Sequence, residues 1–230
     1  METGTMAQYS SEALPDLIRR VKGNVVSPSD ANYDEVRAIW NAMIDKRPAV
    51  IVRCSTADDI PEAIDFARHH GLEISIRGAG HNIAGNSLCD GGLVIDLSNM
   101  RNVRVDASNK RAHVQPGATL GDFDAAVQAH GLATPVGINS TTGIGGLTLG
   151  GGFGWLTRKY GMTVDALVSV DIVTADGRKL HADKSENPDL FWAVRGGGGN
   201  FGVVASFEFQ LYPVGPEITA GLIVFPAAQS

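Results

Sequence analysis

The pattern of hydrophobic and polar residues predicts two helices and then a strand in the first quarter of the chain. Helices are expected over Glu12–Lys22 and Tyr33–Met43, and Ser29 or Asp30 provides an N-cap for the second. The apolar run Ala49–Arg53 then predicts a short buried strand.

The next segment predicts a helix between two strands. This helix is capped by Ser55 or Thr56 and ends before Gly71, with acidic residues in its first turn and basic residues in its last. Because that arrangement stabilises the helix dipole, we interpret the His69–His70 pair as a helix end rather than a metal site. The strand Leu72–Ile76 follows, and the strand–helix–strand order is typical of an α/β unit.

The rest of the chain predicts short strands with helices between them. The expected strands are Leu93–Leu97, Val103–Asp106, Arg111–Gln115, Ala166–Thr174, Lys179–His181, Val203–Leu211 and Ile218–Phe225. Helices are expected over Thr119–Ala129 and from Asn187 through Val194. The dipeptide Asp176-Gly177 separates two of these strands and predicts a hairpin turn.

Composition and charge narrow the classes of protein to which the chain can belong. It has 230 residues, of which 43% are hydrophobic and 19% charged, and this is the composition of a folded globular protein. A net charge of -6 argues against a nucleic-acid partner, and no apolar run is long enough to span a membrane. The first residues lack the pattern of a secretory signal, so a cytoplasmic location is expected.

The cysteines and histidines predict neither disulfides nor a metal site. Only Cys54 and Cys89 are present, and we interpret both as small buried hydrophobic residues. The six histidines are scattered along the chain rather than clustered with cysteines, so no metal is expected.

Three glycine-dense segments are the most informative feature of the sequence. They are Ile76–Asn82, Gly143–Gly154 and Arg195–Gly202. Glycine lets the main chain approach a ligand closely, and successive N–H groups in such a turn form an anion-binding concavity without a lysine. Structural turns that bind nothing are the alternative for any one segment, but three in one chain favour loops that converge on a large, multiply charged ligand.

Known glycine motifs do not explain these segments. The spacing Gly-x-Gly-x-x-Gly fails because Thr148 stands where the last glycine belongs. The chain also has no Gly-x-x-x-x-Gly-Lys-Ser/Thr loop and no Gly-x-Ser-x-Gly elbow, which excludes a P-loop and the usual serine hydrolase. A diphosphate held by backbone amides, with hydroxyl donors from Thr141, Thr142 and Thr148, is the interpretation that remains.

Four ordered motifs resemble the FAD-linked oxidases, and more narrowly the berberine-bridge-enzyme-like branch of the vanillyl-alcohol-oxidase/PCMH superfamily. They are Arg77–Asn82, Gly91–Ser98, the Gly143–Gly154 block and Phe191–Val204. The resemblance runs from about Arg47 to about Pro213. It implies an α+β fold, a PCMH-type FAD-binding domain in which FAD lies between two α+β subdomains.

The resemblance also implies the cofactor-binding residues. His81 matches the family histidine that is bonded covalently to the 8α-methyl group of the flavin. The other implied contacts are Arg77, Gly78, Ala79, Gly80, Asn82, Asn139, Thr141, Thr142, Gly143, Gly145, Gly146, Gly150, Gly151, Ile172, Gly202 and Val203. Doubly linked members carry a cysteine where this chain has Asn139, so one covalent link, through His81, is expected.

The domain limits that we expect follow from the same resemblance. Residues 1–46 form a helical lead-in, residues 47–213 the FAD-binding domain with subdomains of about 47–106 and 107–213, and residues 214–230 the start of a substrate domain. Because relatives continue into that domain, we expect the catalytic residues there, together with a cover for the flavin. Either that domain or a partner chain would also cover an exposed apolar sheet face.

Three functions remain open at this level. The first is an oxidase that takes a hydride from an alcohol or amine C–H bond of a small molecule onto flavin N5, with oxygen as the acceptor. The second is a non-catalytic flavin-binding subunit that transfers electrons to a partner, and the third is a dehydrogenase with another acceptor. Tyr160 and His113 are the candidate acid–base residues, but both are interpreted as structural.

Overall fold

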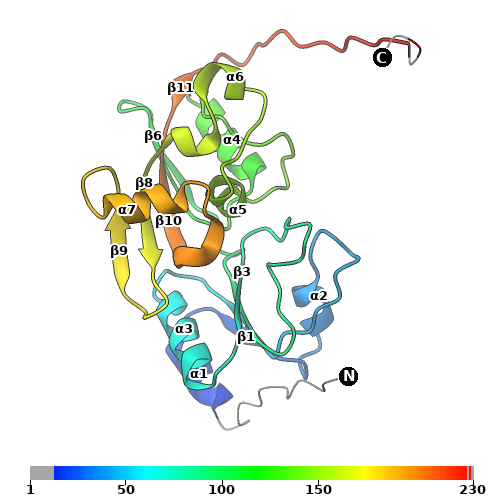
Figure 1. Cartoon of the computed structure of the whole chain (residues 1–230), viewed down its shortest axis with the longest axis vertical. Coiled ribbons are helices and arrows are strands. Elements are labelled where there is room, and N and C mark those ends of the chain that lie inside the picture. Colours follow the sequence, from blue (N-terminus) through cyan, green and yellow to red (C-terminus); the bar gives the residue numbers. More distant parts are fainter. Residues whose placement is uncertain (1–12, 227, 229–230) are drawn as a thin grey trace.

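The computed structural model describes residues 13–226 and 228, which form two lobes, each built on its own sheet (Figure 1). The first sheet has the order β1-β2-β4-β3, with strands Asn24–Val26, Val50–Arg53, Leu93–Asp96 and Ile74–Arg77 respectively. β2, β4 and β3 are parallel, whereas β1 is antiparallel to β2. The helices of this lobe are α1 (Leu14–Arg20), α2 (Tyr33–Arg37) and α3 (Asp59–His69).

The first sheet is buried on both faces, which explains its nearly continuous apolar strands. Val50 and Val52 of β2 pack in one cluster with Ile60 of α3, while Ile51 packs on the other face with Val36 of α2. The predicted α/β unit is confirmed, but β4 lies between β2 and β3 and pairs with both.

The second sheet is antiparallel and has the order β5-β6-β10-β8-β9. Its strands are Val103–Asp106, Arg111–Val114, Val203–Gln210, Leu167–Val173 and Lys179–Ala182 respectively. The remaining elements of this lobe are α4 (Leu120–Gln128), β7 (Leu132–Ala133), α5 (Ile144–Leu149), α6 (Thr157–Tyr160), the 3₁₀ turns Thr163–Asp165 and Gly198–Phe201, α7 (Pro188–Val194) and β11 (Tyr212–Pro213), which pairs with β7.

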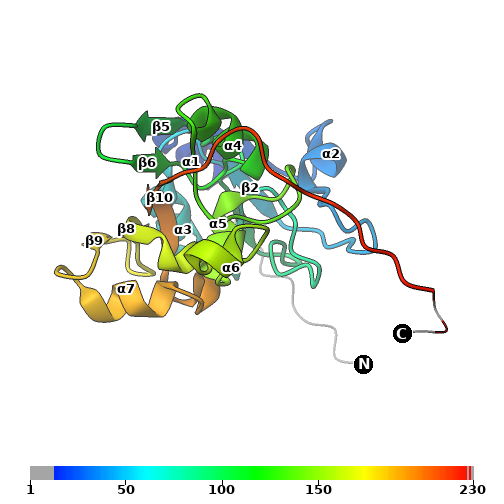
Figure 2. The same ribbon diagram turned by 90° about the horizontal axis from the view of Figure 1, so that it is seen from above.

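One face of the second sheet carries the core of this lobe, and α4 and α5 lie on that side in Figure 2. Alternation along β10 turns Phe207 and Phe209 toward Phe123 of α4, and leaves Glu208 among the polar groups of the opposite face. The start of α4 is fixed by a capping box between Thr119 and Asp122. The Thr119 hydroxyl accepts the backbone N–H of Asp122, and the Asp122 carboxylate accepts the backbone N–H of Thr119.

The two lobes contact each other through apolar side chains of the second sheet. Val173, Val203 and Ala205 belong to the same buried cluster as the residues between α3 and the first sheet. A surface ion pair joins the lobes at 2.5 Å between Lys179 and Asp58.

Most expected elements are confirmed, and the differences have local causes. The second helix ends at Arg37 rather than Met43, because Ala38 is extended and its N–H closes back onto Glu35. Asp30 does not cap that helix, since its carboxylate accepts the N–H and hydroxyl of Ser27. In α3 the expected capping roles are reversed: the carboxylate of Asp59 accepts the N–H groups of residues 55 and 56.

Other differences concern strands and the glycine block. The short strands β1 and β7 were not expected, and α5 forms inside the Gly143–Gly154 block. No strand forms over Ile218–Phe225, where the chain is extended and exposed and pairs with no strand among residues 13–226. β5 pairs with β6, so the boundary between the sheets falls before Val103 rather than at the expected 106/107. The first helix begins at Leu14, and the expected start at Glu12 lies outside the described residues.

A row of three charged residues crosses the first sheet just before the glycine loop. Asp96 of β4 lies opposite both Arg53 of β2 and Arg77 of β3 in the strand register. Its carboxylate is fully buried and accepts hydrogen bonds from Arg77 at 2.5 Å, Arg53 at 3.2 Å and the N–H of Ser98 at 3.0 Å. Burial is the largest single effect and raises the pKa of Asp96. The hydrogen bonds from Arg77 and Ser98 and the positive charge of Arg77 together outweigh it and hold the pKa below its usual value.

We predict that Asp96→Asn destabilises the fold at pH 7 by about 3 kcal/mol, because it leaves Arg77 charged and buried without its partner. The depressed carboxyl pKa gives a stability contribution that is present above about pH 4 and lost as the pH falls below it. Urea unfolding of both proteins at pH 7 measures the first effect, and unfolding of the wild type at about pH 4 and about pH 2 measures the second. As a control, Asp16→Asn removes an exposed ion pair to Arg19 and changes the midpoint little. Equal midpoints for the two variants at pH 7 would contradict the prediction.

Candidate functional site

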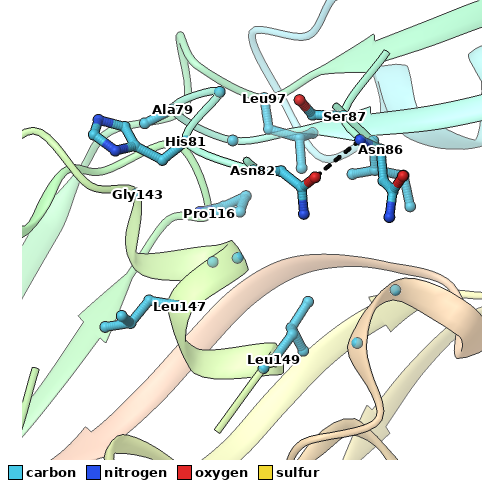
Figure 3. A pocket seen from close by; sticks show the side chains of 18 of the residues that line it. Ala79, His81, Asn82, Asn86, Ser87, Leu97, Pro116, Gly143, Leu147 and Leu149 are labelled. Atoms are coloured by element: carbon cyan, nitrogen blue, oxygen red, sulfur yellow. Dashed lines mark hydrogen bonds between the residues drawn. The ribbon is translucent and has the colours of Figure 1, made fainter. Parts of the chain in front are cut away.

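The three glycine-dense segments meet at one cleft between the lobes, with a volume of about 850 Å³. Gly78–Asn82 comes from the loop after β3, Gly143–Gly150 from the start and length of α5, and Gly198–Gly202 from the turn before β10. Figure 3 shows Ala79, His81 and Asn82 on one side of this space and α5 on the other. The expected convergence of the glycine segments is confirmed, and the volume is within the usual range of about 300–1,000 Å³ for small-molecule sites.

The cleft is lined by unpaired main-chain donors. The N–H groups of Ala79, Gly80, His81 and Asn82, and those of Gly145 and Gly146, donate to no protein acceptor among the described residues. Unpaired N–H groups at a cleft require water or a ligand acceptor. No Asp, Glu, Lys or Arg side chain lines the cleft within the described part of the chain, so main-chain groups supply the positive potential for an anion.

Two glycines of the second segment differ in what surrounds them. A Cβ at Gly143 would lie 2.8 Å from the nitrogen of Ala79, so the missing side chain allows the first and second glycine segments to touch. A Cβ at Gly146 would meet nothing within 4 Å and would project into open space at the cleft. The first glycine sets the distance between the loops, and the second keeps the cleft free.

His81 is held from two sides at the mouth of the cleft. The Trp40 ring stacks on the imidazole with 5.3 Å between ring centroids, and the backbone N–H of Trp40 donates to the carbonyl of Gly80 at 3.1 Å. On the other side, Nε2 lies 3.0 Å from the Thr141 hydroxyl. Burial lowers the pKa of His81 below its usual value of 6.5, so the imidazole is neutral at pH 7.

Ser87 is a cleft residue that the sequence did not indicate. Its side chain is buried and lines the cleft (Figure 3), and its hydroxyl has no hydrogen-bond partner among the described residues. The loop that carries it is closed by a bond from the Asn86 N–H to the Asn82 side chain at 2.9 Å. A serine in a polar loop gives no sequence signal of burial, whereas a buried hydroxyl without a partner indicates a ligand contact.

The structure brings most of the expected cofactor-binding residues to the cleft. Those that line it are Gly78, Ala79, Gly80, His81, Asn82, Thr142, Gly143, Gly145, Gly146, Gly150 and Gly202. Thr141 is hydrogen-bonded to His81, and Asn139 is hydrogen-bonded to Thr141. Arg77, Gly151, Ile172 and Val203 do not line the cleft.

Three of the residues outside the cleft have structural contacts instead. Arg77 is engaged by Asp96 and by the carbonyl of Val36 at 2.5 Å. Ile172 and Val203 are buried in the cores of the second lobe and of the lobe interface. Any contact of these residues with a ligand stays a prediction.

The two candidate acid–base residues lie away from the cleft. Tyr160 ends α6 and stacks on Tyr212 at 4.3 Å, while His113 lies on β6 at 3.8 Å from Glu208. Their interpretation as structural residues agrees with these contacts. Cys54 and Cys89 are buried free thiols, as expected.

The described residues contain neither a candidate metal site nor a membrane-spanning helix. No group of three or more His, Cys, Asp or Glu side chains there could hold a metal ion. None of the helices of residues 13–226 is long and apolar enough to cross a membrane.

Exposed large apolar side chains lie mostly on loops, with Ile18 on α1, Trp192 on α7 and Ile74 on β3 among the exceptions. Phe153 and Trp155 follow α5, and Met43 and Ile138 lie in other connections. The expected exposed apolar sheet face is not found among the described residues. The apolar side chains of the first sheet are covered apart from Ile74 of β3, and the second sheet exposes charged residues such as Asp171 and Lys179.

Comparison with known proteins agrees with this geometry. Residues 48–183 match the FAD binding domain family. A curated relative, (R)-6-hydroxynicotine oxidase of Paenarthrobacter nicotinovorans, is 39% identical over 91% of this chain and 46% of its own length. The chain spans about half the length of the curated relatives it matches.

Two solved structures have the same fold. BBE-like 1 of Physcomitrella patens has a TM-score of 0.83 and 30% identity, with 86% of this chain and 44% of that chain covered. Glucooligosaccharide oxidase from Acremonium strictum has a TM-score of 0.80 and 34% identity, with 87% and 41% covered. The chain belongs to the FAD-binding domain family of FAD-linked, berberine-bridge-enzyme-like oxidoreductases, and FAD is its cofactor.

Proposed function

We propose that this chain is the FAD-binding half of an oxidase that takes a hydride from an alcohol or amine C–H bond of a small molecule and passes the electrons to oxygen. The cleft with six unpaired main-chain N–H groups and no charged side chain among the described residues carries the proposal. In support, one relative is named a hydroxynicotine oxidase and one structural neighbour a glucooligosaccharide oxidase. The activity is that of a longer protein, because those relatives are about twice the length of this chain.

The residues of the cleft fit FAD. Amides of the Gly78–Asn82 loop and of the first turn of α5 hold the diphosphate, and the buried Ser87 hydroxyl offers a further donor. Apolar side chains such as Leu147, Leu149 and Val204 provide an apolar surface against which the flat rings of FAD would pack. When bound, FAD supplies the ring that accepts a hydride, while the protein supplies orientation and electrostatics.

His81 forms the single covalent link to the 8α-methyl carbon of the flavin. The glucooligosaccharide oxidase neighbour is described as carrying a 6-S-cysteinyl, 8α-N1-histidyl FAD, and Asn139 here supplies no thiol for the cysteinyl bond. The neutral imidazole has a free lone pair at pH 7, which a nucleophile requires. Attachment through His81 would break one methyl C–H bond and the imidazole N–H bond and make one C–N bond. Oxygen would take up the released electron pair and two protons as hydrogen peroxide.

The base that assists substrate oxidation lies outside the cleft residues described. His81 is the one titratable side chain that lines the cleft within the described part of the chain, and the covalent link occupies it. We therefore place the base, and the cover of the flavin, in a substrate domain that begins with residues 214–230. Residues 47–213 form the FAD-binding domain, with residues 1–46 as a lead-in that contributes Trp40.

We predict opposite effects of Gly146→Ala on stability and on cofactor binding. The new methyl group replaces a helical glycine of α5, which stabilises the protein by up to about 1 kcal/mol, and it projects into the cleft, which lowers FAD affinity. Thermal unfolding without FAD and titration with FAD measure the two effects. Gly143→Ala is the matched variant, since its methyl group presses on Ala79 and lowers stability as well. If Gly146→Ala binds FAD as tightly as the wild type, the proposal that FAD lies in this cleft is wrong.

We predict that yellow colour stays in the pellet when the full-length, FAD-loaded protein is precipitated with acid. Mass spectrometry should find the mass increase of one FAD on the peptide that contains His81. His81→Ala should bind FAD and release it into the supernatant on precipitation. A colourless pellet from the loaded wild-type protein would show that the link is absent.

We predict that turnover of the full-length protein produces one hydrogen peroxide per substrate oxidised. A panel of oligosaccharides, alcohols and cyclic amines, assayed with a peroxide-coupled dye, covers the substrate chemistries proposed above. Substrate oxidation that reduces an artificial acceptor but consumes no oxygen would identify a dehydrogenase instead. A protein that only transfers electrons from a reduced partner would support the subunit alternative.

A further inference from the structure

We infer that Asn139 and Thr141 are positioning residues that fix His81 in the tautomer with its proton on Nε2. They so leave Nδ1, the atom named in the neighbour's 8α-N1-histidyl link, free to bond to the flavin. The inference rests on the covalent link proposed above and deepens it. It makes Asn139 and Thr141 positioning residues for flavin attachment, at a place in the chain where doubly linked relatives have a cysteine.

The first step of the argument concerns the orientation of the Asn139 amide. The backbone N–H of Thr141 lies 3.0 Å from Oδ1 of Asn139, and a backbone N–H can only donate. The Asn139 atom that faces it must therefore be the carbonyl oxygen, because the amide nitrogen would place two donors against each other. This contact fixes the side-chain amide without reference to any hydrogen position.

The second step concerns the hydroxyl group of Thr141. Its Oγ1 lies 2.9 Å from the same Oδ1 of Asn139, which can only accept. The single hydroxyl proton must therefore point toward Asn139. Oγ1 then has only lone pairs left for its third neighbour, the imidazole of His81.

The third step transfers this constraint to the histidine. Nε2 of His81 lies 3.0 Å from Oγ1, which can now only accept, so Nε2 carries the proton and donates it. Nδ1 of the neutral ring then has the free lone pair, and it has no hydrogen-bond partner among the described residues. The N–H bond broken on attachment is the one between Nε2 and its proton, which faces Thr141.

Trp40 restricts the remaining freedom of the ring. It stacks on His81 with an angle of 22° between the planes, and its own backbone is tied to the carbonyl of Gly80. A flip of the imidazole about its χ2 bond would keep this stacking but would lose the bond to Thr141. The hydrogen bond therefore decides which nitrogen keeps the free lone pair, and the stacking holds the ring plane.

The test uses the full-length protein produced without flavin in riboflavin-starved cells and then loaded with FAD. Nitrogen-15 NMR of the flavin-free protein, with His81→Gln to assign the signal, reports the tautomer directly. We expect a protonated, pyrrole-type Nε2 and an unprotonated Nδ1 in the wild type. After loading, NMR of the isolated flavin peptide identifies the bonded nitrogen, which we expect to be Nδ1.

Variants separate positioning from folding. Thr141→Val keeps the shape but removes the hydroxyl, so both tautomers should appear and attachment should slow about five- to tenfold, the change expected for one neutral hydrogen bond. Thr141→Ser should restore both the tautomer and the rate. Ser140→Ala, the matched control between the two positioning residues, should behave as the wild type. Thermal unfolding and FAD titration verify that each variant folds and binds.

Three results would overturn the inference: a wild-type signal from a protonated Nδ1, a bond through Nε2, or attachment by Thr141→Val at the wild-type rate and nitrogen. Failure of the covalent link is distinguishable from these. If the wild type binds FAD but forms no covalent bond, both the proposed link and the proposed bonding atom are rejected. The nitrogen-15 spectrum of the flavin-free protein still determines whether the proposed tautomer is correct.

Discussion

The buried pair of Arg77 and Asp96 is the interaction on which the cofactor site depends. Asp96 fixes the end of β3 against β4, immediately before the main chain turns into the glycine loop that carries His81. The second Nη of Arg77 donates to the carbonyl of Val36 at 2.5 Å and so holds the end of α2 as well. One guanidinium thereby ties together two segments that are distant in the sequence.

This arrangement explains how Trp40 and His81 come to stack. Trp40 lies just after the segment that Arg77 holds, and His81 lies just after Arg77 itself. The bond from Trp40 N–H to the Gly80 carbonyl then joins the two segments directly. The imidazole is therefore positioned by the first lobe on one side and by Thr141 of the second lobe on the other, so its geometry depends on the docking of the two lobes.

The sequence predicted most of the strands, the cofactor loops and the family, because those features are local in the chain. Apolar runs and glycine motifs each act over a few neighbouring residues. The sequence could not show that β4 lies between β2 and β3, or that the short β1 completes the first sheet, because these pairings depend on distant partners. Trp40 and Ser87 were missed for the same reason, since only the folded chain places Trp40 against His81 and Ser87 at the cleft.

The absence of charged side chains from the described lining of the cleft has a consequence for cofactor retention. Neutral N–H groups attract a diphosphate only when several point at it together, so affinity depends on the spacing between the loop after β3 and the start of α5. The contact of Gly143 with Ala79 sets that spacing, and any opening of the lobes would weaken every donor at once. The covalent bond that we propose at His81 would remove this dependence, because a tethered cofactor remains at high effective concentration while the donors separate and close again. The proposed covalent link and the uncharged binding loops would therefore be complementary parts of one site.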